Sequence, residues 1–192
     1  MRNVTVLELE KKYSNINYQA DEAKLYSIYV SDFDDYVEEN KEYVMDWMQR
    51  NDIVPSYVYI EIYKDNEDVI EKTLEEMNLS YKKNTTKLDP IYQIKVDKLE
   101  ETLKLIDQYY WLAAENLLMM FTTGEVQTKC KQDEHFITAH IPPGECVITI
   151  EHDGQGMQLL TAKEEFLTKE GIIDTLGNIH LEQWNKQYYG LR

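Results

Sequence analysis

Strand and helix periodicities alternate through the first 122 residues of the chain. The segment 56–63 is the clearest case, because Val58, Ile60 and Ile62 alternate with tyrosine and glutamate residues, the pattern of a half-buried strand. In 66–78 the apolar residues instead recur every three or four positions, as they do along one face of a helix. The whole series comprises strand patterns at 24–30, 56–63 and 91–96 and helix patterns at 32–50, 66–78 and 98–121.

The remainder of the chain has a different pattern. Three segments rich in β-formers, at 135–141, 146–152 and 157–162, are separated by the turn sequences PPGE and DGQG. This arrangement predicts a three-stranded antiparallel meander. A helix pattern follows and ends at Gly177, a residue type that is favoured just past a helix C-terminus.

Glycine usage also divides the chain, since no glycine precedes Gly124. We therefore expect an α+β fold in which an acidic half with strand–helix alternation, 1–122, packs with a meander-and-helix half, 123–192, as one globular unit. Dinucleotide fingerprints and P-loops need glycines at strand–helix junctions so that backbone N–H groups can approach phosphates. The first half lacks those glycines, and no cofactor is predicted.

Acidic residues are concentrated in one part of the sequence. The formal net charge is −16 at pH 7, and residues 21–80 hold 17 acidic and 5 basic side chains. Such a surface repels nucleic acid and anionic membranes, so we expect neither as a partner. An acidic mimic of DNA ranks lower, because the carboxylates are interleaved with apolar helix faces.

Cysteine content and hydropathy bear on the compartment. Cys130 and Cys146 are the only cysteines, and the N-terminal residues lack the apolar run of a signal peptide. The longest apolar stretches, around 111–121, are too short to cross a bilayer. These features favour a cytoplasmic protein in a reducing environment, with export by a signal-free route left open.

The acidic half contains the residues that we expect to contact a partner. Small acidic proteins without cofactor motifs include the immunity proteins that neutralise basic toxins, an analogy of composition alone. We therefore predict a protein-binding module, of an immunity or inhibitor type, that captures a basic protein. The alternative is that the acidity only maintains solubility. The predicted contact residues are Asp35, Glu38, Glu39, Glu42, Asp46, Tyr57, Tyr59 and Tyr63.

A metal-dependent enzyme is the competing interpretation. A four-residue turn at 142–145 would place Ala139 opposite Ile148 and His135 opposite His152, and paired imidazoles can ligate a metal or transfer protons. Histidines at the rim of a hairpin more often only meet solvent, so we predict no catalytic residue and no metal site, with His135 and His152 as weak candidates. Glu115, within an apolar stretch, would become a candidate acid if it were buried.

Overall fold

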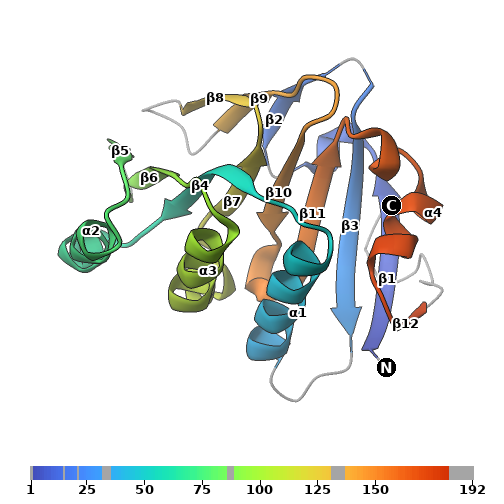
Figure 1. Ribbon diagram of the computed structural model, residues 1–192, viewed down its shortest axis with the longest axis horizontal. Helices are drawn as coiled ribbons and strands as arrows, with labels where there is room; N and C mark the ends of the chain where they lie inside the picture. Colours follow the sequence, from blue (N-terminus) through green and yellow to red (C-terminus); the bar gives the residue numbers. More distant parts are fainter. Residues whose placement is uncertain are drawn as a thin grey trace.

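The structure, a computed structural model, describes residues 2–14, 16–20, 22–31, 36–85, 89–130 and 137–181. It has the α+β fold that the sequence predicts (Figure 1). The helices are α1 (Tyr36–Arg50), α2 (Glu67–Glu76), α3 (Leu99–Ala114) and α4 (Lys169–Thr175), with short 3-10 helices η1 (Lys11–Tyr13), η2 (Lys64–Asn66), η3 (His152–Gly154) and η4 (Glu164–Phe166). The strands are β1 (Arg2–Leu9), β2 (Asn17–Gln19), β3 (Lys24–Ser31), β4 (Pro55–Glu61), β5 (Tyr81–Asn84), β6 (Ile91–Lys95), β7 (Met119–Thr123), β8 (Gln127–Cys130), β9 (Ile137–His140), β10 (Cys146–Ile150), β11 (Gly156–Thr161) and β12 (Ile179–Leu181).

A nine-stranded sheet forms the centre of the molecule. Its strand order is β12-β1-β3-β11-β10-β7-β4-β6-β5, and every pairing is antiparallel except that of β1 with β12. Helices α1, α2 and α3 lie side by side across one face of this sheet (Figure 1). Strands β2, β9 and β8 form a second, three-stranded sheet.

Two hydrophobic cores lie on opposite sides of the large sheet. Neighbouring residues of β3 belong to different cores, since Tyr26 packs in the cluster that includes the helices and Leu25 packs in the cluster that includes the small sheet. Successive side chains of a strand point to opposite faces, so the small sheet covers part of the face that the helices leave open. The strands between the two cores are buried on both faces.

Strands from both predicted halves of the chain alternate within the large sheet. β3 pairs with β1 and with β11, and β7 pairs with β4 and with β10. The predicted division at residue 122 therefore lies within β7 and within a shared sheet.

One expectation about local structure was wrong. The helix predicted to reach residue 121 ends at Ala114, and Met119–Thr123 forms the central strand β7. A continuous apolar run is compatible with either a buried helix or a strand that is buried on both faces, and here it is the strand. Glu115 at the helix end is exposed, so the condition of burial under which it would have been a candidate acid is not met.

The predicted meander is only partly present. β10 and β11 form the expected antiparallel hairpin, with Ile148 opposite Leu159. β9, however, pairs with β2 and β8, and Ala139 lies opposite Tyr18 and Thr128 rather than opposite Ile148. The two prolines between β9 and β10 belong to a connection that passes from one sheet to the other.

Candidate functional site

The exposed side of α1 carries most of the acidic residues that were predicted to contact a partner. Glu38, Glu42 and Asp46 are exposed and Glu39 is half-buried, while Trp47 and other apolar residues of the helix face the core. The helical period separates these two sides, as the sequence indicated. Asp35, the remaining predicted acidic residue, lies outside the described residues.

Two basic residues partly neutralise this side of α1. Lys41 Nζ lies 2.6 Å from Glu38 Oε1 and 3.0 Å from Asp107 Oδ1 of α3. Arg50 Nε lies 3.2 Å from Asp46 Oδ2. The Lys41 contacts connect Glu38 of α1 to Asp107 of α3.

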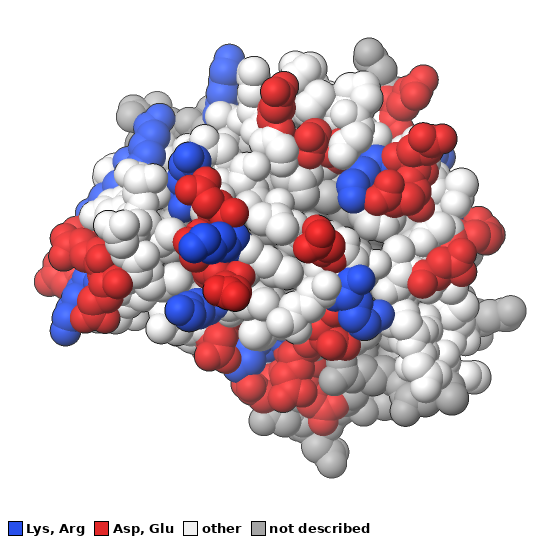
Figure 2. All heavy atoms as spheres, viewed as in Figure 1, with Lys and Arg blue, Asp and Glu red and all other residues white. Residues whose placement is uncertain are grey.

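Acidic residues predominate over the whole helical layer. Helices α1, α2 and α3 together contain twelve acidic and four basic residues, a balance of −8. Figure 2 shows this face, with acidic groups spread over it and basic ones interspersed, and an acidic group over α2 at the left edge. Half of the formal net charge of −16 is thus contributed by three helices on one side of the molecule.

The predicted tyrosine surface does not form. Tyr59 is fully buried, and its hydroxyl is hydrogen-bonded to Thr128 of the small sheet. Tyr57 is partly buried against the same core, with its ring 6.4 Å from that of Tyr59. Both side chains therefore point to the face opposite the helices, and neither can share a surface with the acidic side of α1.

Tyr63 lies beyond the end of β4, and its side chain contacts α3 instead of the small sheet. Its ring centroid is 6.5 Å from that of Trp111 on α3, with the ring planes inclined by 32°. Tyr63 is 38% exposed and Trp111 42% exposed. Trp111 was missed in the sequence, although its spacing of four residues from both Asp107 and Glu115 is the signal that places it on the polar side of a helix.

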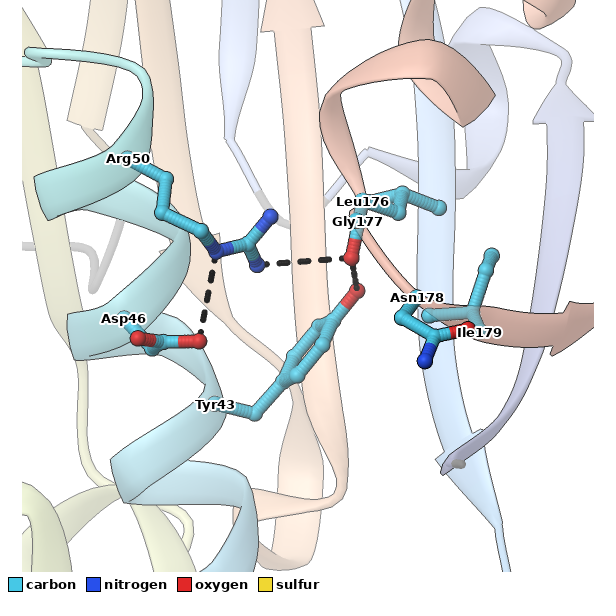
Figure 3. Close-up of a pocket in the computed structure, with 7 residues that line it drawn as sticks. All are labelled: Tyr43, Asp46, Arg50, Leu176, Gly177, Asn178 and Ile179. Atoms are coloured by element: carbon cyan, nitrogen blue, oxygen red, sulfur yellow. Dashed lines mark hydrogen bonds and ion pairs between the residues drawn. The ribbon is translucent and has the colours of Figure 1, made fainter.

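A pocket of about 360 Å³ lies between α1 and the end of α4 (Figure 3). Its guanidinium group is engaged within the protein: Arg50 Nη1 donates to Thr175 O at 3.1 Å and Nη2 donates to Leu176 O at 3.3 Å. These carbonyls are at the C-terminal end of α4, where a cation is stabilised by the helix dipole. Arg50 therefore fastens α4 to α1. The pocket is lined by Tyr43, Asp46, Arg50, Leu176, Gly177, Asn178 and Ile179.

The histidine region does not have the predicted pairing. His152 Nδ1 is hydrogen-bonded to Asn116 Oδ1 at 2.9 Å, while His135 lies outside the described residues. His140 lies on β9 and lines a second pocket, of about 720 Å³, together with Glu22 and Pro142. Within the described part of the chain, no group of three or more His, Cys, Asp or Glu side chains is arranged to hold a metal ion.

Cys146 is not placed for nucleophilic chemistry. Its side chain is buried in the core, and burial raises the pKa of the thiol to about 11. A thiol with so high a pKa is protonated at neutral pH and reacts slowly.

Comparison with known proteins gives no relative: no protein-family model, no curated protein and no solved structure matches this chain. Over the described residues, no helix is both long enough and apolar enough to span a membrane.

Proposed function

We propose that the protein binds a basic protein partner through the face that carries α1, α2 and α3. The observation that supports this proposal is the charge of the helical layer, in which acidic residues outnumber basic ones by twelve to four. An extended acidic surface attracts a cationic partner, accelerates association and makes binding sensitive to salt. An inhibitor or immunity-type protein that covers a basic surface would use this chemistry.

The contact residues in this proposal are those that lie on the helical face. Glu38, Glu39, Glu42 and Asp46 belong to α1, and Tyr63 adds an aromatic contact beside α3. Tyr57 and Tyr59 are omitted, because their side chains lie against the small sheet.

A charge-reversal variant tests the proposal. Proteins retained by the immobilised wild type at 50 mM NaCl and released at 500 mM NaCl are identified, and a retained basic protein is purified. Its dissociation constant is then measured for the variant Glu38→Lys/Glu42→Lys/Asp46→Lys. We expect binding at 50 mM NaCl to weaken about tenfold or more. The variant breaks the Glu38–Lys41 and Asp46–Arg50 pairs, and Lys41 keeps its contact with Asp107. Circular dichroism should show an intact fold, since both carboxylates are exposed and each pair contributes only about 0.5 kcal/mol.

The matched control reverses three exposed carboxylates in the loops that enter and leave the small sheet. The variant Glu10→Lys/Glu22→Lys/Glu125→Lys changes the net charge by the same amount at a distance from the helices. Binding should weaken much less in this control. If no basic protein is retained, or if the two variants weaken binding equally, the helical face is not the binding surface.

A further inference from the structure

Trp111 and Tyr63 form an exposed aromatic pair on the acidic side of the molecule. Trp111 is the least buried tryptophan that the structure describes, since Trp47 is completely buried. The cation–ring contacts of the described residues involve Tyr13, Tyr18, Tyr92 and Phe166, and none involves Trp111. The indole is therefore available to a group from outside the described chain.

Carboxylates lie on either side of this pair. Asp107 precedes Trp111 by four residues and Glu115 follows it by four, so both lie one helical turn away, and both are exposed. Asp65, also exposed, follows Tyr63 by two residues, and the exposed Lys64 lies between them. Exposed aromatic groups surrounded by charged residues resemble the energetically dominant centre of a protein interface, which has a polar rim.

Charge determines which partner suits the pair. A second copy of this protein would bring its own net charge of −16 to a surface rimmed by carboxylates, and the repulsion opposes self-association. A cationic side chain has the complementary charge. Arginine fits better than lysine, because the planar guanidinium stacks on aromatic faces, is weakly hydrated and can simultaneously pair with a carboxylate.

We propose that Trp111 and Tyr63 are the anchor for an arginine side chain of a basic protein partner, with its guanidinium over the indole and paired with Glu115 or with the carboxylate of Asp107, whose Oδ1 also contacts Lys41. This inference rests on the proposed function and adds a source of specificity to it. The acidic layer attracts a basic partner, and the aromatic pair selects arginine at one point of the interface.

Two labelled peptides, nona-arginine and nona-lysine, serve as probes in fluorescence anisotropy at 150 mM NaCl. For the variant Trp111→Leu, which keeps an apolar side chain but removes the ring, we expect about fivefold to tenfold weaker binding of nona-arginine. Binding of nona-lysine should weaken by about twofold or less. Trp111→Phe should retain most of the affinity for nona-arginine, because the aromatic face is preserved.

The control variant is Tyr81→Leu. Tyr81 is 37% exposed and is itself in ring contact with Tyr92, but it lies on the edge strand β5. This variant should change the affinity for either peptide less than twofold. Unchanged thermal unfolding of both leucine variants would show that the fold is intact.

The outcomes separate this inference from the proposed function. If the wild type binds neither peptide in a salt-dependent manner, the proposed function is wrong and the arginine anchor is wrong with it. The triple charge reversal on α1 could abolish peptide binding while Trp111→Leu changes the affinity no more than Tyr81→Leu does. That result would support the acidic binding surface and contradict the arginine anchor. If Trp111→Leu lowered the affinity for both peptides equally, the selection of arginine would be contradicted. A dimer of this protein that depends on Trp111 would overturn the choice of partner.

Discussion

Glu151 is a partly buried carboxylate just beyond β10. Ser27 Oγ of β3 donates a hydrogen bond to its Oε1 at 2.5 Å. Burial raises the pKa of Glu151, and the hydrogen bond from Ser27 and the nearby His152 offset only part of this effect. The folded protein therefore holds a proton on this carboxyl more readily than the unfolded chain does.

The raised pKa fixes the sign of a pH dependence. Between the unfolded and folded pKa values the folded state binds more protons, so the free energy of unfolding falls as pH rises through that window. Glu151→Gln keeps an acceptor for Ser27 and removes the charge. We expect its melting temperature to exceed that of the wild type at pH 7.5, with a smaller difference at pH 4, as measured by circular dichroism. A difference that does not vary with pH would contradict this account.

Individual residues also show what the sequence could and could not predict. The exposed acidic residues of α1 follow directly from the helical period, because one side of that helix faces a core. Tyr59 could not be placed in this way, since alternation assigns a side chain to one face of a sheet but does not reveal whether a second layer covers that face. Trp111 was missed for the opposite reason: its hydrophobicity suggested a core position, and only its spacing from Asp107 and Glu115 indicates otherwise.

At the scale of elements, Asn116 ends α3 and begins the connection to β7. It has a φ of 65°, in the left-handed region that is unfavourable for most side chains. Its Oδ1 accepts a hydrogen bond from Asp153 N at 3.1 Å and lies 2.9 Å from His152 Nδ1. One residue therefore reverses the chain and binds the helix end to the β10–β11 connection.

Two substitutions at Asn116 separate these contributions. Asn116→Ala loses both the conformational tolerance and the hydrogen bonds, and should lower the free energy of unfolding by about 2 kcal/mol. Asn116→Gly tolerates the positive φ and loses only the hydrogen bonds, so about 1 kcal/mol is expected. Urea denaturation would measure both values. A glycine variant that is as unstable as the alanine variant would show that the backbone conformation contributes little.

Most elements could be predicted from local pattern, whereas their pairing could not. The strand at 56–63 and the helix at 66–78 were found at β4 and α2 with small differences at their ends. The run from Leu117 to Phe121 was assigned to a helix because hydrophobic periodicity does not distinguish a buried helix from a buried strand. The transfer of β9 to the small sheet depends on contacts with β2, more than a hundred residues earlier, which no local pattern contains.

At the scale of the whole molecule, the two halves of the sequence are connected through the core. Trp47 of α1 is completely buried, its Nε1 donates to Thr175 Oγ1 at 2.9 Å, and its ring lies 6.2 Å from that of Phe166. Thr175 and Phe166 both belong to the C-terminal half. The helical layer that carries the proposed binding surface is therefore held in place by residues from both halves.

This arrangement predicts that neither half folds alone. A fragment of residues 1–122 would leave β3 without β11 and β4 with only the incomplete β7, exposing apolar faces and unpaired strand edges. We expect the fragments 1–122 and 123–192 to be unfolded or aggregated when expressed separately. The intact chain should unfold in urea in one transition, with tryptophan fluorescence and far-ultraviolet circular dichroism coinciding. A fragment 1–122 that melts cooperatively with the emission of a buried Trp47 would mean that the acidic half is an independent domain, and that its helical surface could act without the rest of the sheet.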